Sequence, residues 1–241
     1  MIIVDRNSPL PLHHQLKQHL LEKIELGEWK PDDLIPSEQE LQDQFGLSRT
    51  TVRQALSDLT HEGLLIRERG RGTFVTPPKM THSPDARKGL TEFMLQQGIT
   101  PGWKIIEKGF VTANKETAVN LDLPPKSRVY RLRRLRLAEE KPIGVHTAYL
   151  PEAVAAQINE AALLEGGSLQ YISHIPQMMT SRASRIIEAI PASEPDVSLL
   201  QIAPGSPILQ IIRVARSSSG EPLEYLEARY RGDRFKYQIG E

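Results

Sequence analysis

Arginines two positions apart are the strongest indication of ligand chemistry in the second half of the sequence. Arg134 and Arg136 lie in a run of β-prone residues, and side chains two positions apart on a strand point to the same face. Two guanidinium groups on one face can bind a phosphate or a carboxylate through charge-assisted hydrogen bonds. The alternative is a solvated basic edge, because Arg131 and Arg133 lie next to them in the sequence.

A second group of arginines, in the first third of the sequence, has a spacing that suits DNA. Arg49 and Arg53 are four residues apart in a predicted helix, so they share its outer face, and Thr50 lies beside them. Guanidinium groups bind both phosphate oxygens and the edge of guanine. The alternative is that these arginines form the solvated face of a domain with a purely structural role.

Other kinds of chemistry find little support in the residues. The 241 residues include no cysteine, which excludes disulfides, thiolate metal sites and cysteine nucleophiles. Seven histidines are scattered without carboxylates at metal-ligand spacing. The run Gly70-Arg71-Gly72 is too short for a loop that binds a nucleotide phosphate, and Ser181 and Ser184 lack a nearby histidine–aspartate pair. We therefore expect no catalytic residue, no metal and no cofactor.

The charge balance means that any DNA contact must come from local placement. Lys plus Arg and Asp plus Glu both number 30, so the net charge is zero and a basic coat is excluded. Residues 1–79 hold ten basic and twelve acidic side chains, whereas residues 47–76 hold five arginines and three acidic residues. So few phosphate contacts per subunit predict modest affinity, and two subunits would be needed for tight binding.

The elements that must position the first group of arginines can be read from periodicity and capping signals. Apolar residues at helical spacing predict a helix over 11–26. Ser37 and Glu40 match a capping box, which predicts a short helix to about residue 44, and Ser48 can cap a helix over 49–62. Residues 64–75 predict a hairpin with a Gly-rich turn. This order is typical of a winged helix-turn-helix, whose second helix enters the major groove.

The motifs of this region resemble those of the GntR family of bacterial transcription regulators. The resemblance is carried by residues 35–41, 45–56, 62–64 and 70–75. It implies that Arg49 reads a guanine, that Gly70 enters the minor groove, and that Thr50 and Arg53 contact phosphate. Gln39 stands where the family often has arginine, and glutamine can pair with adenine. The DNA-binding residues implied are Ser37, Gln39, Ser48, Arg49, Thr50, Thr51, Arg53, Arg69, Gly70, Arg71 and Gly72.

The pattern of predicted elements changes in the second half of the sequence, which predicts a second domain. A segment rich in Pro and polar residues, 77–88, is expected to link residues 1–76 to residues 89–241. Beyond it we expect strands over 104–113, 128–138, 143–150, 182–190, 208–217 and 222–230. Helices are expected over 90–97, 115–121 and 153–164. Antiparallel strands with interspersed helices define an α+β domain.

This half resembles the UTRA effector-sensing domain of the HutC subgroup of GntR regulators. The pieces that carry it include residues 90–92, 134–136, 141–143, 149–151, 167–169 and 224–235. The resemblance implies a chorismate-lyase-like fold, an antiparallel sheet with flanking helices that binds small metabolites and forms homodimers. It implies effector contacts from Leu90, Thr91, Arg134, Arg136, His146, Ser168, Glu224 and Tyr230. His146 stands where amino-sugar-phosphate sensors of this type usually have Glu, so such a ligand is in doubt, and a core histidine is the alternative.

These observations predict a ligand-responsive regulator, usually a repressor, which binds a palindromic double-stranded operator as a homodimer and responds to a small anionic effector. The alternatives are a metabolite-converting enzyme of lyase-like fold and an architectural DNA-binding protein that ignores ligands. No targeting segment is evident, and the apolar stretch over 197–212 is interrupted by Pro204, Gly205 and Pro207. We therefore expect a cytoplasmic protein with no membrane partner.

Overall fold

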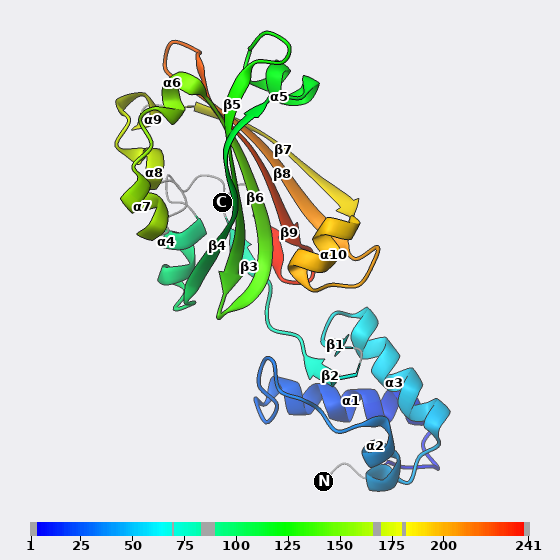
Figure 1. The fold of residues 1–241 in the computed structure, drawn as a ribbon. Coiled ribbons are helices and arrows are strands. Elements are labelled where there is room, and N and C mark those ends of the chain that lie inside the picture. Colours follow the sequence, from blue (N-terminus) through cyan, green and yellow to red (C-terminus); the bar gives the residue numbers. More distant parts are fainter. Residues whose placement is uncertain (1–3, 69, 83–89, 166–169, 180–181, 239–241) are drawn as a thin grey trace. The chain divides into compact units, whose positions relative to one another are not determined.

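The chain folds into two compact units, Met1–Pro78 and Lys79–Glu241 (Figure 1). The computed structural model describes residues 4–68, 70–82, 90–165, 170–179 and 182–238. No helix among these residues is long and apolar enough to cross a bilayer.

The first unit is a winged helix-turn-helix, as its sequence pattern predicts. Its elements are helices α1 (Leu12–Glu25), α2 (Glu38–Phe45) and α3 (Arg49–His61) and strands β1 (Leu65–Glu68) and β2 (Gly72–Val75). The predicted capping box is present, since the Ser37 amide donates to Glu40 Oε2 (2.7 Å) and the Glu40 amide donates to Ser37 Oγ (3.3 Å). Gly46 ends α2 in the left-handed region (φ 62°), which glycine adopts without strain and which allows the tight turn into α3.

The core of this unit forms where the apolar faces of the helices meet. Leu16 and Leu20 of α1 pack with Val52, Leu56 and Leu59 of α3, and all five are buried. This arrangement leaves the opposite face of α3, with its arginines, directed toward solvent.

The second unit contains a six-stranded antiparallel sheet, which confirms the predicted α+β class. Its order is β4 (Pro101–Thr112), β5 (Arg128–Ala138), β6 (Lys141–Pro151), β9 (Pro222–Arg231), β8 (Pro207–Arg216) and β7 (Arg182–Pro191). Strand β9 lies between β6 and β8, so residues that are far apart in the chain share one face of the sheet. The register aligns Arg134 with His146 and Ala228, and Arg136 with Gly144 and Tyr230.

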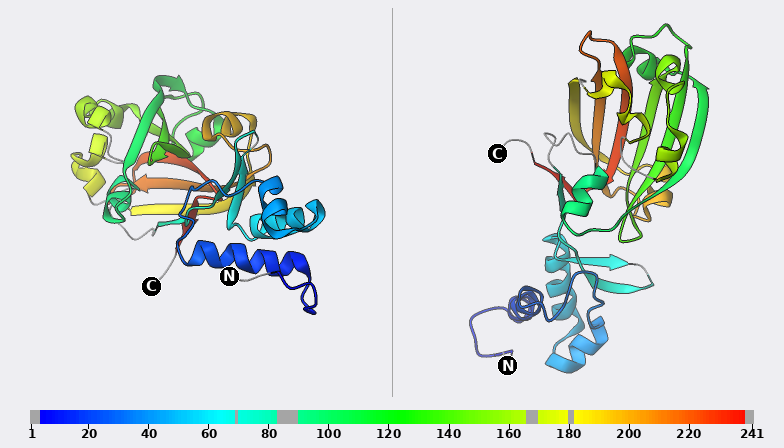
Figure 2. Two further views of the ribbon diagram at one scale, coloured as in Figure 1. Left: turned by 90° about the horizontal axis from the view of Figure 1, so that it is seen from below. Right: turned by 90° about the vertical axis from the view of Figure 1, so that its left-hand side faces the viewer.

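Helices cover both faces of the sheet (Figures 1 and 2). One face carries α4 (Leu90–Gln96), α6 (Glu152–Ala155), α7 (Glu160–Glu165), α8 (Gln170–Ser173) and α9 (Pro176–Met179). The other carries α5 (Lys115–Asn120) and α10 (Glu194–Leu200). The expected single helix over 153–164 is wrong. The chain breaks there into α6 and α7, because Asn159 Oδ1 accepts from the Ala162 amide (3.1 Å) and its own amide donates to the Tyr171 carbonyl (2.9 Å).

A short parallel strand pair joins the segment after the first unit to the C-terminal region. Strand β3 (Met80–His82), which lies within the segment expected to be a linker, pairs with β10 (Phe235–Tyr237). The turn before β10 holds an internal ion pair, with Arg231 Nη2 2.7 Å from Asp233 Oδ2. The Phe235 ring stacks on Tyr230 with centroids 4.0 Å apart. The turn therefore sets the position of β10 against the sheet.

We expect Asp233→Asn to destabilise the second unit by about 1–3 kcal/mol at neutral pH, because it removes a charge-assisted hydrogen bond from a half-buried site. Burial alone would raise the pKa of Asp233, but hydrogen bonds and the charge of Arg231 outweigh it and lower the pKa. A depressed folded pKa contributes stability above the ordinary aspartate pKa of about 3.9, and this is lost as pH falls through the folded value. Urea unfolding at pH 7 and pH 3 should show a larger difference between variant and wild type at pH 7 than at pH 3. Asp122→Asn, which breaks an exposed pair with Arg216, is the control and should change stability little. An equal Asp233→Asn effect at both pH values would contradict the assignment.

Candidate DNA-binding surface and effector site

The N-terminal part of α3 presents the arginines predicted to meet DNA. The Arg49 side chain is 72% exposed and that of Arg53 is 58% exposed. Together with Thr50 they line a shallow groove along the helix. Ser48 caps α3, since the Thr51 amide donates to Ser48 Oγ (3.2 Å) and the two hydroxyl groups are 2.8 Å apart. This cap holds the first turn of α3 in place, so the direction of Arg49 is set by a well-defined helix end.

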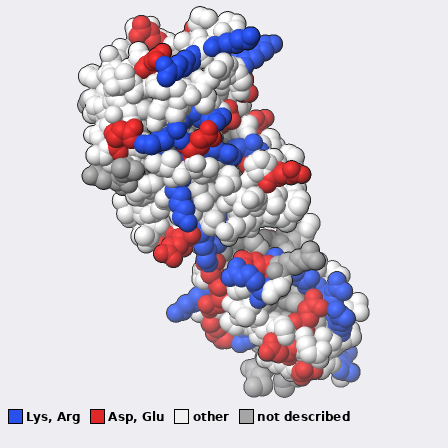
Figure 3. All heavy atoms as spheres, viewed as in Figure 1, with Lys and Arg blue, Asp and Glu red and all other residues white. Residues whose placement is uncertain are grey.

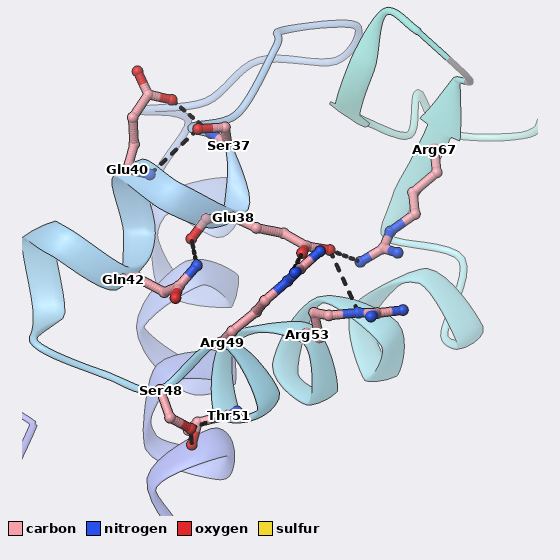
Figure 4. A network of polar contacts seen from close by, with 9 residues as sticks. All are labelled: Ser37, Glu38, Glu40, Gln42, Ser48, Arg49, Thr51, Arg53 and Arg67. Carbon is pink, nitrogen blue, oxygen red and sulfur yellow. Dashed lines mark hydrogen bonds and ion pairs between the residues drawn. The ribbon is translucent and has the colours of Figure 1, made fainter.

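One carboxylate connects the arginines of this surface (Figure 4). Glu38, the first residue of α2, lies with Oε2 3.7 Å from Arg49 Nε and Oε1 3.8 Å from Arg53 Nε. Arg67 Nη2 on β1 donates to Glu38 Oε1 at 3.1 Å. Neither Glu38 nor Arg67 was predicted from the sequence to have a role. The structure brings them to the predicted surface by placing α2, α3 and the wing side by side.

The wing depends on two glycines with positive φ. Gly70 has φ 76° and Gly72 has φ 127°, and a Cβ on Gly72 would lie 2.5 Å from Leu34 Cδ1. Arg71, between them, forms an ion pair with Glu68, and its guanidinium lies over the Phe74 ring at 5.4 Å. Arg69, also predicted to contact DNA, lies outside the described residues.

Gln39 and Ser37 lie on the exposed first turn of α2. Gln39 Nε2 donates to Asp43 Oδ1 (3.0 Å), and Ser37 serves as the helix cap. Basic and acidic side chains are interspersed on the face of the molecule in Figure 3. This agrees with the zero net charge and leaves the arginines around Glu38 as a local positive cluster.

The second predicted site is a buried pair of guanidinium groups. Arg134 is 1% exposed and Arg136 is 0% exposed, whereas Arg131 and Arg133, which alternate with them on β5, are half-buried. Arg136 Nη2 donates to Thr91 Oγ1 on α4 (2.6 Å), and the Arg134 guanidinium lies 4.8 Å from the centre of the Tyr171 ring on α8. The pair therefore faces the helix-covered interior, so it is not the solvated basic edge that the sequence left open.

The electrostatics of this pair favour an anion. Burial, followed by the like charge of Arg134, lowers the pKa of Arg136 to about 10. The Arg136 guanidinium therefore still carries its charge at neutral pH. Two buried positive charges side by side are costly unless a negative group offsets them.

An ion pair at the same sheet face organises the surroundings. Glu224 is buried, and its carboxylate binds Arg213 and accepts from the Tyr171 hydroxyl (2.7 Å). Burial opposes the charge of Arg213, but Glu224 raises the pKa of Arg213 overall. Burial, reinforced by Glu224, raises the pKa of Tyr171. Tyr171 and Arg213 were not predicted from the sequence, although an arginine within the apolar run 208–215 was a usable signal.

His146 and Tyr230 form a second buried pair beside the guanidinium groups. The two residues are 2.7 Å apart between His146 Nε2 and the Tyr230 hydroxyl, and their rings meet edge to face. This contact fits the alternative interpretation from the sequence, in which His146 is a core histidine. In the register of the sheet, His146 lies directly opposite Arg134. Leu90 is buried at the start of α4. Ser168 lies outside the described residues, and those residues contain no cluster of potential metal ligands.

The winged helix-turn-helix of the first unit and the buried arginine pair of the sheet domain together define a two-domain, DNA-binding regulator. Residues 12–75 match the family described as bacterial regulatory proteins, gntR family, and residues 96–236 match the UTRA domain. The chain belongs to the GntR family of bacterial regulators, in the group that carries a UTRA domain. As a member of this family it binds DNA and responds to a small-molecule effector, and it is a transcription regulator and not an enzyme.

Individual relatives agree over nearly the whole length. The chain is 35% identical to the HTH-type transcriptional repressor NagR of Bacillus subtilis, covering 97% of this chain and 96% of that protein. It is 31% identical to the histidine utilization repressor of Pseudomonas aeruginosa, covering 85% and 81%. The crystal structure of PhnF from Mycobacterium smegmatis matches with a TM-score of 0.60 at 26% identity, covering 95% and 98%.

Proposed function

We propose that this regulator is a repressor that binds a palindromic operator as a homodimer and releases it when a small anionic metabolite binds the second unit. The buried pair Arg134 and Arg136 is the observation that carries the ligand class, because two guanidinium groups on one covered sheet face have the geometry that binds a phosphate or a carboxylate. Relatives named as repressors support the direction of regulation. Two recognition helices would then meet half-sites separated by about 34–36 Å or a multiple.

The proposed effector contains a phosphate or a carboxylate group. Arg134 and Arg136 bind this group, and the Thr91 hydroxyl, already in contact with Arg136, orients the clamp. His146 and Tyr230 lie toward the remainder of the ligand. We assign Glu224 a role in organising Tyr171 and Arg213 around the clamp, because its carboxylate is bound by both. The relative named for histidine utilization supports a nutrient-derived ligand.

A chain of contacts leads from this site toward the linker. Tyr230 contacts His146 through its hydroxyl and stacks on Phe235 through its ring. Phe235 pairs with Met80 in the β10–β3 ladder, and Pro78 and Lys79 directly precede Met80 in the chain. We propose that ligand binding shifts Tyr230 and, through this ladder, the linker. A coupling free energy of about 1–3 kcal/mol would lower operator affinity about 5–150-fold.

The experiment that tests this function is fluorescence anisotropy on DNA from upstream of the gene and its neighbours. A shuffled sequence is the control, and phosphorylated and carboxylated metabolites are added in turn. Sequence-specific binding that one such metabolite weakens supports the proposal. Specific binding that responds to no anionic metabolite would contradict the ligand class, and binding equal to the shuffled control would contradict operator recognition.

Arg49→Ala is expected to reduce the preference for operator over shuffled DNA by about 1–3 kcal/mol, because a bidentate contact with guanine is lost. Arg53→Ala, four residues along the same helix face, is the matched variant. If Arg53 binds phosphate, its loss weakens binding to both DNAs about equally and reduces the salt dependence. The measurement is anisotropy on both DNAs at several salt concentrations. An unchanged preference in Arg49→Ala would refute its role as a base reader.

A further inference from the structure

Glu38 occupies an unusual position for an acidic side chain, at the centre of the surface proposed to meet DNA. Its carboxylate contacts guanidinium groups from two different elements, with Arg49 and Arg53 on α3 and Arg67 on β1 (Figure 4). Its backbone is held as well, because its carbonyl accepts from Gln42 Nε2 (3.0 Å) and Ser37 caps the same turn. Its side chain is 29% exposed, so the carboxylate has a restricted orientation at the edge of the surface.

A carboxylate at this place lowers the attraction to DNA. Phosphate contacts supply most of the sequence-independent affinity, and each neutralised arginine contributes less to them. The same carboxylate offsets the repulsion between Arg49 and Arg53, which lie one helical turn apart. Glu38 therefore contributes to DNA recognition through the geometry of the arginines and not by raising the affinity for DNA.

Reading a guanine edge needs a guanidinium in one orientation. A bidentate contact requires the planar group to lie parallel to the base edge, and a free arginine loses rotamer entropy when it adopts that orientation. Glu38 Oε2 lies 3.7 Å from Arg49 Nε, the nitrogen nearest the chain, so this ion pair does not use the two terminal nitrogens that a bidentate base contact needs. The same arrangement applies to Arg53.

We propose that Glu38 is a positioning residue for sequence readout, which holds Arg49 ready for the base edge and keeps Arg53 and Arg67 from binding phosphates in other registers. This rests on the proposed role of Arg49 as a base reader. A direct contact between Glu38 and a cytosine amino group is the other chemistry open to a carboxylate here. Positioning is favoured because three guanidinium groups already surround the two carboxylate oxygens.

Two variants of Glu38 separate its charge from its reach. Glu38→Gln keeps the size and removes the charge, and we expect the operator-to-shuffled affinity ratio to fall by about tenfold. Binding to shuffled DNA should become tighter, with a steeper salt dependence equivalent to about one extra phosphate contact. Glu38→Asp keeps the charge but is one methylene shorter, so it should lower the ratio without tightening shuffled binding. Glu68→Gln removes a charge of the wing that pairs with Arg71, and it should leave the ratio unchanged.

The combination with Arg49→Ala tests whether Glu38 acts through Arg49. The affinity ratio of the double variant Glu38→Gln/Arg49→Ala should be no lower than that of Arg49→Ala alone, because the effects of coupled residues are not additive. Each protein is measured on the operator, on single-base variants of it and on the shuffled DNA. Thermal unfolding of each variant tests whether the first unit is folded. If Glu38→Gln does not fold, Glu38→Asp takes its place in the comparison.

Three results would overturn the positioning role. These are a Glu38→Gln ratio within about twofold of wild type, additive losses in the double variant, and a loss confined to one cytosine of the operator. If wild-type protein itself does not distinguish the operator from shuffled DNA, the proposed operator recognition fails, and that failure is separate from any result on Glu38.

Discussion

Replacing Arg136 with alanine is expected to abolish the response to the effector while ligand-free protein still binds the operator. The guanidinium is fully buried, so its contact with an anionic group forms in a site with little water. Truncating one member of such a charge-assisted contact costs about 2–5 kcal/mol of binding free energy, or roughly 30–5000-fold in affinity. Effector concentrations that release wild-type protein from the operator should leave the variant bound.

The protein without effector should tolerate this change, because the substitution removes one of two like charges that repel each other. Burial and the charge of Arg134 already lower the pKa of Arg136, so the charged form is less favoured in the folded state than in water. Arg133→Ala is the matched control, since the same residue type lies on the same strand with its side chain on the other face. Anisotropy with increasing effector, and the ligand-induced rise in melting temperature, measure the effect. A normal response in Arg136→Ala would eliminate the clamp.

Glu224→Ala is expected to destabilise the second unit by about 3–5 kcal/mol, because it leaves the largely buried charge of Arg213, whose side chain is 15% exposed, without its carboxylate. The Tyr171 hydroxyl also loses its acceptor. Tyr171 contacts Arg134 through its ring, so the anion clamp should loosen as well. The sequence contains two tryptophans, and with Trp29 replaced by Phe the fluorescence of Trp103 on β4 reports urea unfolding of this unit alone.

Two further variants identify the cause of that loss. Glu152→Ala breaks an ion pair with Arg128 in which both side chains are more than half exposed, and it should cost less than about 1 kcal/mol. Glu224→Leu combined with Arg213→Met replaces both charges with apolar side chains, and it should recover most of the stability. If the double variant is as unstable as Glu224→Ala, the loss of stability comes from the cavity that the truncated side chain leaves and not from the unpaired charge of Arg213. A Glu224→Ala loss no larger than that of Glu152→Ala would contradict the ion-pair role.

Local features of both units could be predicted because neighbouring residues encode them. The capping box of Ser37 and Glu40 and the helical spacing of the apolar residues determine the helices of the first unit. The two-residue period of a strand likewise places Arg134 and Arg136 on one face. The approximate ranges of the long strands followed from runs of β-prone residues that end at turns. The break between α6 and α7 was missed, because its cause is an Asn159 contact with the Tyr171 backbone.

The sequence by itself determined the class of regulator, the arginines of α3 and the pair of guanidinium groups on β5. Only the tertiary structure decided which carboxylates meet which arginines. Glu38 reaches Arg67, 29 positions away, because α2 packs beside the wing, and Tyr171 reaches Glu224, 53 positions away, because α8 covers β9. Such pairs depend on which elements become neighbours when the apolar faces are buried. No local periodicity records that choice, so charge partners of the DNA surface and of the effector site had to come from the fold.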